Sequence, residues 1–265
     1  MLDVWRAADE IELYESGWNF DHFYPIFSDD SHGPCLEGWS TLTALAQATE
    51  RIRVGVLVTG IPYRHPAVLA NMAATVDVIS NGRLELGLGA GWNDEEADAY
   101  GISLGTTLTE RFDRFDESLE VIVSLLTNEV SNFNGRHYTL TDAYCEPKSI
   151  QRPHPPICIG GAGPTRTIPA VARWAQHWNH PGGTVESWKA SRDLLWAECE
   201  RIGRDPAEIM TSTHLLANAE DPGVTVAQAE AFAEAGLDMG IVYLPPPHTP
   251  ATLEAHAVAL QHLAD

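Results

Sequence analysis

The chain is 265 residues long, is 44% hydrophobic by composition and carries a formal net charge of −21. The length suits one α/β barrel of about 250 residues, while the acidic charge argues against nucleic-acid binding, which needs a basic surface. No run of about 18 apolar residues predicts a membrane span. The N-terminus lacks the basic and apolar regions of a secretory signal, so we expect a cytoplasmic protein.

Strand and helix patterns alternate along the chain and predict a single domain over residues 1–265. Segments with strand character lie at 17–22, 52–58, 83–89, 156–161, 176–180, 209–218 and 239–244. Helices are expected at 37–50, 66–79, 110–127, 165–175, 185–203, 225–236 and 250–264. Thr225 and Thr249 are expected to cap the last two helices. The alternation predicts a parallel sheet in an α/β fold of the TIM (β/α)8 type.

The first strand of such a barrel has no counterpart in the pattern. Residues 3–15 form an amphipathic segment that predicts a helix, and no strand pattern precedes them. A closed barrel has eight strands, so the barrel apparently lacks its first strand and has unpaired edges. We expect that Met1 is not the natural start and that upstream residues supply the strand. A naturally open barrel is the alternative.

Residues 128–155 form the long irregular stretch of the chain. The segments 130–135 and 137–140 predict a short hairpin, and a cluster of prolines then leads into the strand at 156. Connections of this length in compact domains usually serve a function. We therefore expect an excursion from the barrel at about 128–155.

Glycines and an aromatic residue follow the strand at 83–89, where a helix is expected to begin. Gly89 and Gly91 allow backbone to approach a ligand closely, and Trp92 is placed to wall a cavity beside them. This pattern predicts a binding face for a flat cofactor at the carboxyl ends of the strands. The alternative is close helix–strand packing, with Trp92 as a buried staple.

A second glycine-rich turn leads into the helix at 165–175. It contains Gly160, Gly161, Gly163, Thr165 and Arg166. Backbone N–H groups at a helix start, together with an arginine side chain, predict a phosphate site. The chain has no Walker motif and no N-terminal Rossmann GxGxxG, so direct pyridine-nucleotide binding is not expected. It also has no HxH, HExxH or CxxC motif, so no metal site is expected and the four cysteines are taken as reduced thiols.

Five motifs in this order resemble the bacterial luciferase-like oxidoreductases, and more narrowly the branch that depends on the deazaflavin coenzyme F420. They are the segments 20–23, 63–67 and 80–92, Glu96 with 100–102, and 155–161. The resemblance runs from about residue 3 to the C-terminus and is strongest over 17–180. It implies an eight-stranded barrel, F420 as the cofactor with FMN as the alternative and, by resemblance alone, a homodimer.

The resemblance also assigns residues to the cofactor site. It places His22 near the redox centre as the catalytic residue, with Asp21 beside it; an Asp-capped turn with a structural histidine is the alternative. Val56, Leu57 and Thr59 are expected to support the back of the cofactor ring. A non-proline cis peptide bond is expected within 56–59, and an ordinary trans strand is the alternative.

Three further residues are interpreted against this family. Trp178 either adds a polar wall to the cofactor site or is a buried indole with one satisfied N–H group. Glu96 is expected to be a structural carboxylate and not a catalytic acid. In the sugar-phosphate dehydrogenases of the family an acid takes the place of Trp92, which weakens the assignment of that substrate.

Together these features predict an oxidoreductase that transfers a hydride between F420 and a small organic substrate. One alternative is an FMN-dependent monooxygenase served by a separate reductase. Another is a non-catalytic cofactor-binding protein or a truncated family member. The substrate itself depends on the loops 23–36, 93–108 and 128–150, whose shapes the sequence does not determine.

Overall fold

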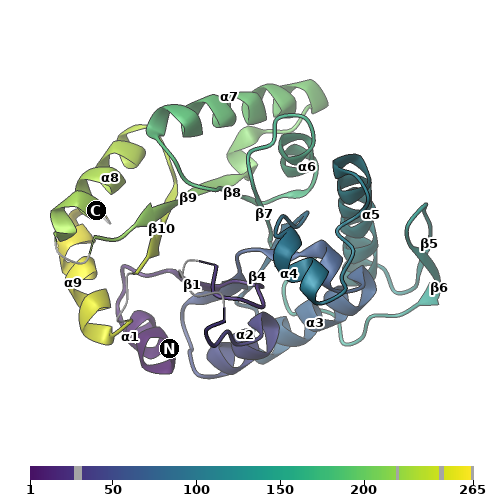
Figure 1. Ribbon diagram of the computed structural model, residues 1–265, viewed down its shortest axis with the longest axis horizontal. Coiled ribbons are helices and arrows are strands. Elements are labelled where there is room, and N and C mark those ends of the chain that lie inside the picture. The colour runs from purple at the N-terminus through teal and green to yellow at the C-terminus, as the bar shows by residue number, and fades with distance from the viewer. Residues whose placement is uncertain (27–31, 219–220, 245–247, 264–265) are drawn as a thin grey trace. The chain divides into compact units, whose positions relative to one another are not determined.

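The computed structural model describes residues 1–26, 32–218, 221–244 and 248–263 (Figure 1). Its contacts divide the chain into two compact units. Unit 1 comprises Met1–Gly17, Ala48–Ile52 and Cys158–Asp265, and unit 2 comprises Trp18–Gln47 and Arg53–Ile157. The assignment of residues 1–265 to a single domain stays a prediction. No helix in the described ranges is long and apolar enough to cross a membrane.

Unit 2 is built on short parallel strands. They are β1 (Ser16–Asn19, whose second half lies in this unit), β2 (Arg53–Val56), β3 (Thr59–Gly60) and β4 (Leu84–Gly89). Strand β2 pairs with β4 at Val54 and Leu84, and β3 pairs with β4 further along at Thr59 and Leu88. The single strand expected at 52–58 is thus interrupted after β2.

Helices follow the strands of unit 2 and pack beside them. They are α2 (Gly38–Gln47), α3 (Pro66–Ile79), α4 (Asp94–Ala99) and α5 (Leu108–Thr127), with a 3-10 turn at Ile61–Tyr63. Helix α2 packs on β2, and α3 packs on β4 and on both α2 and α5 (Figure 1). Pro66 occupies the first turn of α3 as expected, because its missing N–H group has no intrahelical partner there.

The hairpin expected within 128–155 is confirmed. Strands β5 (Ser131–Asn134) and β6 (Thr139–Ala143) pair antiparallel. The Glu117 carboxylate on α5 accepts backbone N–H groups from Arg136, His137 and Tyr138 at 2.7, 2.8 and 3.1 Å. This carboxylate therefore ties the hairpin turn to the helix.

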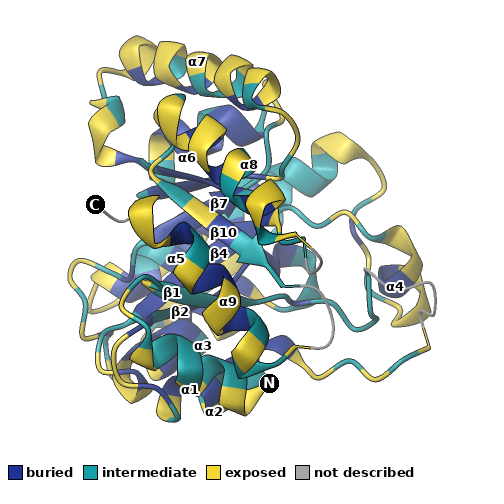
Figure 2. Ribbon diagram, turned by 90° about the vertical axis from the view of Figure 1, so that its left-hand side faces the viewer, coloured by how far each residue is buried: buried dark blue, intermediate teal, exposed yellow. Residues whose placement is uncertain are grey.

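Unit 1 contains the second run of parallel strands and helices. Its strands, in sheet order, are β7 (Ile157–Gly160, with Ile157 counted in unit 2), β8 (His177–His180), β9 (Met210–Leu216) and β10 (Met239–Tyr243). Its later helices are α6 (Thr167–Trp174), α7 (Val185–Ile202), α8 (Pro222–Glu234) and α9 (Pro250–Leu260), with 3-10 turns at Pro206–Glu208 and Gln261–Leu263. Helix α7 buries only Trp188, Leu195 and Cys199, and the rest of its length is mostly exposed (Figure 2).

The first helix, α1 (Leu2–Glu10), also belongs to unit 1, and no strand precedes it in the described residues, as expected. The Asp9 carboxylate accepts N–H groups of Glu50, Arg51 and Ile52 at 2.7 to 2.9 Å. The Arg51 guanidinium in turn donates to carbonyl oxygens at the end of α1 and beyond it, those of Ala8, Asp9, Ile11 and Tyr14. These contacts tie α1 to residues 50–52, and the Trp5 ring of α1 also lies against Gly17 of β1.

One capping prediction is confirmed and one is wrong. Thr249 caps α9, where its side chain accepts the N–H group of Thr252. Helix α8 instead begins three residues earlier than expected and is capped by Asp221. Thr225 is buried within its first turn, where its hydroxyl accepts the N–H group of Asn218.

Candidate functional site

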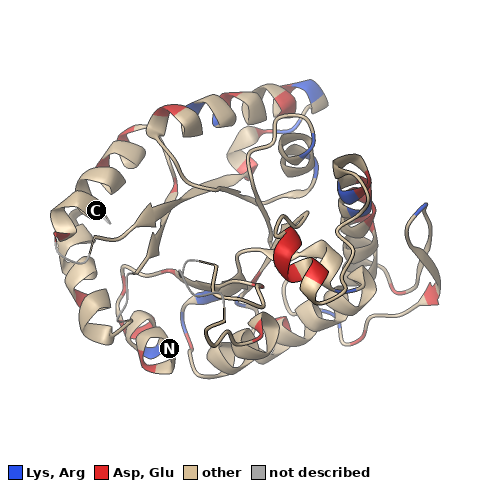
Figure 3. Cartoon of the chain, in the orientation of Figure 1, with Lys and Arg blue, Asp and Glu red and all other residues tan. Residues whose placement is uncertain are grey.

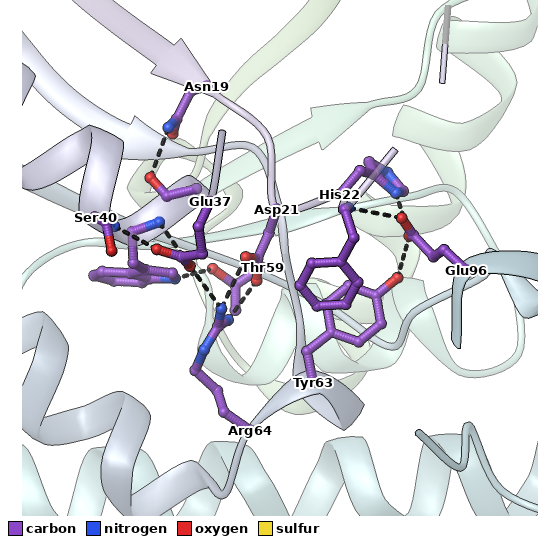
Figure 4. Close-up of polar contacts among 12 residues, drawn as sticks. Asn19, Asp21, His22, Glu37, Ser40, Thr59, Tyr63, Arg64 and Glu96 are labelled. Carbon is purple, nitrogen blue, oxygen red and sulfur yellow. Dashed lines mark hydrogen bonds and ion pairs between the residues drawn. The ribbon is translucent and has the colours of Figure 1, made fainter. Parts of the chain in front are cut away.

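The segment after β1 and helix α4, both in unit 2, bring His22 and Glu96 into contact. His22 follows β1, and Glu96 lies on α4, which follows β4. The imidazole Nδ1 of His22 lies 2.5 Å from Oε1 of Glu96 (Figure 4). The His22 side chain is 12% exposed whereas the Glu96 side chain is fully buried. The Nε2 atom has no hydrogen-bond partner in the described residues and is not among the buried unpaired atoms, so it reaches the surface.

The Glu96 carboxylate has two further donors. The Tyr63 hydroxyl donates to Oε1 and the Phe23 N–H group donates to Oε2 at 2.8 Å. Burial, and then the adjacent Glu96 carboxylate, raise the pKa of Tyr63 above its usual range. The phenol therefore stays protonated at neutral pH and acts as the donor in this contact.

Asp21, beside His22, faces the opposite way toward Arg64 (Figure 4). Both Asp21 oxygens accept from Arg64, at 2.5 and 2.9 Å, and Arg64 also contacts Glu37 at 3.2 Å. Burial raises the pKa of Asp21, and the Arg64 guanidinium opposes that shift. The assignment of Asp21 to cofactor binding stays a prediction, and its described contacts are those of a buried ion pair.

The segment that links β2 to β3 contains the expected unusual bond. The peptide bond between Leu57 and Val58 is cis, within the 56–59 range, so the trans alternative is wrong. Val56 and Thr59 are buried on either side, and the Thr59 hydroxyl accepts the indole N–H group of Trp39 at 3.0 Å. Contact of Val56, Leu57 and Thr59 with a cofactor stays a prediction.

Packing inside unit 2 accounts for the glycines at the end of β4. A Cβ atom on Gly87 would lie 1.9 Å from the Val56 carbonyl oxygen, and one on Gly89 would lie 2.6 Å from the Val58 side chain. Gly91 has a φ of +83° and lies against Pro62. Packing of β4 against the neighbouring segment 56–62, and not the helix–strand packing given as the alternative, therefore explains these positions, and ligand contact by Gly89 and Gly91 stays a prediction.

Trp92 is exposed, so its interpretation as a buried staple is wrong. The side chain is 63% exposed and its indole meets the His22 ring edge to face, with 5.3 Å between the ring centroids. The two rings are inclined at 66° and form an apolar corner, whose polar atoms are Nε2 of His22 and the indole N–H group of Trp92.

A hollow of about 450 Å³ opens in the same unit. It is lined by Phe23, Tyr24, His32, Gly33, Cys35, Glu95 and Ala99. Helix α4 beside it carries the exposed carboxylates Asp94, Glu95 and Asp98, in addition to the buried Glu96 (Figure 3). Since like charges repel, this surface disfavours an anionic ligand. The described residues contain no group of three or more potential metal ligands.

In unit 1, the residues predicted for the phosphate site form the turn between β7 and α6. They are Gly160, Gly161, Gly163, Thr165 and Arg166, and α6 begins at the next residue, Thr167. Gly161 has a φ of +117°, and Cβ atoms on Gly161 and Gly163 would lie 3.2 and 3.0 Å from the Thr167 side chain. Phosphate binding by this turn stays a prediction.

Trp178 lies in β8 and is fully buried, and its indole N–H group donates to the Gly161 carbonyl at 2.8 Å. This geometry matches the interpretation of Trp178 as a buried indole with one satisfied N–H group. Its assignment to the cofactor site has no support from these contacts and stays a prediction.

Sequence reasoning missed the contacts of Glu96 with His22 and with Tyr63. From the sequence, Glu96 is expected to be a structural carboxylate, and Tyr63 enters only as part of a motif. A charged residue three positions after the helix cap Asn93 is a signal for a helix start. No local signal shows that its side chain turns inward toward a histidine 74 residues away.

A profile of the luciferase-like monooxygenases matches residues 14–242. The chain is 36% identical over 171 residues to the F420-dependent glucose-6-phosphate dehydrogenase of Amycolatopsis mediterranei, which covers 63% of this chain and 47% of that protein. It is 29% identical over 193 residues to the FMNH2-dependent dimethylsulfone monooxygenase of Pseudomonas putida, with coverage of 72% and 52%. The chain thus spans about half the length of these relatives.

Solved structures show the same fold. An F420-dependent secondary alcohol dehydrogenase in complex with an F420–acetone adduct has a TM-score of 0.84 at 17% identity, over 98% of this chain and 94% of that one. The F420-dependent tetrahydromethanopterin reductase of Methanopyrus kandleri has a TM-score of 0.79 at 18% identity, over 97% and 92%. The predicted α/β fold of the TIM type, without the first strand, is confirmed.

Proposed function

The chain belongs to the luciferase-like monooxygenase family, and from this membership we propose that it transfers a hydride between the deazaflavin coenzyme F420 and a small organic substrate. The family includes both F420-dependent and FMN-dependent oxidoreductases. The choice of F420 is supported by the similarity to F420-dependent relatives at 36% and 33% identity, against 29% for the FMNH2-dependent one.

The observation that carries the proposal is the arrangement of His22 and Trp92 in unit 2. The exposed indole of Trp92 and the accessible Nε2 atom of His22 lie side by side at the ends of β4 and β1. A planar ring with polar edges can lie against the exposed indole face with one edge toward Nε2 of His22, which supports this assignment. The residues present therefore fit the cofactor of the proposed reaction.

Bound F420 would supply the carbon that exchanges a hydride with the substrate. His22 would take up the substrate proton at Nε2 as a neutral imidazole and return it as an imidazolium ion. Trp92 would form a wall on the substrate side of the site. The acidic surface of α4 favours an uncharged or cationic substrate over a sugar phosphate.

The cofactor assignment is tested by anaerobic fluorescence titration with F420 and with FMN. We expect tighter binding of F420, followed by anaerobic turnover when small uncharged alcohols are added. Product formation that requires reduced FMN and consumes oxygen would instead establish the monooxygenase alternative. Monodisperse protein that binds neither cofactor would support the non-catalytic alternative.

The phosphate assignment for the turn at 160–166 is tested separately. We expect Arg166→Ala to weaken binding of F420 about tenfold or more, because a charge-assisted hydrogen bond is lost. Binding of a deazaflavin that carries no phosphate should be unchanged by the same substitution. Equal effects on both ligands would remove Arg166 from the phosphate site.

A further inference from the structure

We propose that Glu96 is a positioning residue that keeps the proton of neutral His22 on Nδ1, so that Nε2 is the atom that exchanges a proton with the substrate. The kinetic consequence rests on the proposed function. The assignment of the tautomer concerns the protein alone and does not depend on any bound cofactor.

The contacts of Glu96 determine which atoms are donors. Its Oε1 atom receives the Tyr63 hydroxyl and faces Nδ1 of His22, and its Oε2 atom receives the Phe23 N–H group. An ionised carboxylate is only an acceptor, so it suits three donors around it. A proton on Oε1 would compete with the Tyr63 hydroxyl, whose own proton is retained because burial raises its pKa. The arrangement therefore places a hydrogen on Nδ1.

Burial makes this arrangement specific. Glu96 has no exposed side-chain surface, so water cannot replace a lost donor. An unpaired buried charge is costly, and each of the three donors offsets part of that cost. Rotation of the His22 ring would leave Glu96 short of a donor, so the ring is held with Nε2 toward the surface.

The tautomer gives His22 a defined role in hydride transfer. If the substrate is an alcohol, bound F420 would take the hydride of its C–H bond, and Nε2 of His22 would take the proton of its O–H bond. The substrate becomes a carbonyl compound and His22 becomes an imidazolium ion beside the Glu96 carboxylate. In the opposite direction, Nε2 returns the proton to the carbonyl oxygen as the hydride arrives. The Tyr63 hydroxyl donates to the same carboxylate oxygen that faces Nδ1, and it thereby fixes the group that orients the imidazole.

The tautomer is tested by nitrogen NMR on cofactor-free protein labelled with ¹⁵N in the histidine rings. His22→Asn identifies the resonances of His22. We expect the neutral wild-type ring to show a protonated Nδ1 and an unprotonated Nε2. In Glu96→Gln, whose amide can donate as well as accept, the ring should shift toward the Nε2-protonated form or a mixture. A wild-type ring protonated on Nε2, or a tautomer unaltered by Glu96→Gln, would overturn the proposal.

Kinetics on the F420-loaded enzyme provide the second measurement. Glu96→Gln should lower kcat about 10²-fold or more, with a changed pH profile and with KM within about threefold of wild type. Glu117→Gln is the matched control, because Glu117 is a carboxylate of the same unit with three donors outside the site. It should leave kcat and the His22 tautomer unchanged. A Glu96→Gln variant with wild-type kcat and pH profile would contradict the positioning role.

Tyr63→Phe keeps the proposal testable if Glu96→Gln does not fold. Loss of the hydroxyl removes one of three donors, so a partial change of the His22 tautomer and a smaller loss of kcat are expected. If the NMR results agree but no F420 turnover is found, the tautomer assignment stands and the proposed function fails. If F420 turnover is found but the His22 tautomer is unaltered in the variants, the proposed function stands and the tautomer assignment fails.

Discussion

His22 is the residue on which the proposed chemistry depends. One ring nitrogen lies against the buried carboxylate of Glu96 and the other reaches the surface beside Trp92. The two nitrogens thus have separate tasks, one structural and one chemical. Neighbouring Asp21 has a different environment, because both of its oxygens are occupied by Arg64.

Replacement of His22 by asparagine separates these two tasks. The asparagine amide lies near the position of Nδ1 and can still donate to Glu96, but nothing replaces Nε2. We expect the free energy of unfolding to change by no more than about 1 kcal/mol while kcat falls about 10² to 10⁴-fold. Steady-state kinetics and urea denaturation check this. A kcat within tenfold of wild type would exclude His22 from the proton transfer.

Trp92→Ala tests the exposed indole as part of the ligand surface. Loss of this side chain should weaken cofactor or substrate binding by about 1 to 3 kcal/mol, the usual value of an aromatic contact surface, with no loss of stability because the indole is exposed. Trp196→Ala is the matched control, because Trp196 is an exposed tryptophan on α7 at 41%. If both variants bind as the wild type does, Trp92 is not part of the binding surface.

At the scale of elements, β4 depends on glycine because of strand packing. A methyl group at Gly87 would meet the Val56 carbonyl oxygen at 1.9 Å, and a backbone atom cannot move aside as a side chain can. No atom of the described residues lies within 4 Å of the corresponding position at Gly101, whose φ of +68° is the constraint seen there. Gly87 is therefore required by close packing, and Gly101 by its left-handed backbone conformation.

We expect Gly87→Ala to destabilise the protein by about 3 kcal/mol or more, or to prevent folding, since overpacking typically costs 1 to 3 kcal/mol even where side chains can adjust. Gly101→Ala should cost about 1 to 2 kcal/mol, the strain of a left-handed alanine. Urea denaturation measures both. A smaller effect at Gly87 than at Gly101 would contradict the packing argument.

Helix α1 is held by the guanidinium of Arg51. Four carbonyl oxygens accept hydrogen bonds from this one side chain, and the compact ammonium group of lysine cannot reach them all. Arg51→Lys should therefore lower stability by about 1 to 3 kcal/mol and increase hydrogen exchange in residues 2–10. Arg136→Lys is the control, because the Arg136 side chain is 78% exposed. Unchanged exchange in α1 would show that Arg51 does not hold it.

At the scale of the whole molecule, acid stability depends on two histidines of unit 1, the buried His180 and the half-buried His214. Burial, and then the nearby His180, lower the pKa of His214 to about 4. Burial also lowers the pKa of His180. Both rings are therefore neutral in the folded protein at pH values where exposed histidines become charged.

The direction in which stability changes with pH follows from the lowered pKa of His214. Above the ordinary pKa of about 6.5, both folded and unfolded states keep His214 neutral and its contribution to stability is complete. As the pH falls from about 6.5 to 4, the unfolded state binds a proton that the folded state does not. Stability should then fall, by on the order of 2 to 3 kcal/mol from His214.

Urea denaturation between pH 7 and pH 4 measures this loss. His214→Phe should reduce the dependence on pH, and His248→Asn, at an exposed position, should leave it unchanged. A pH dependence in His214→Phe equal to that of wild type would show that another group is responsible.

The sequence by itself determined the alternation of strands and helices, the hairpin in 128–155 and the place of the cis peptide bond. The first two follow from local periodicity, and the third from a resemblance carried by ordered motifs. Tertiary structure decided the rest. The contact of Glu96 with His22 joins residues 74 positions apart. The glycines of β4 are required because a side chain there would collide with the neighbouring segment 56–58. Side-chain burial and contacts between residues far apart in the sequence depend on how the elements pack, and a local sequence pattern does not reveal that packing.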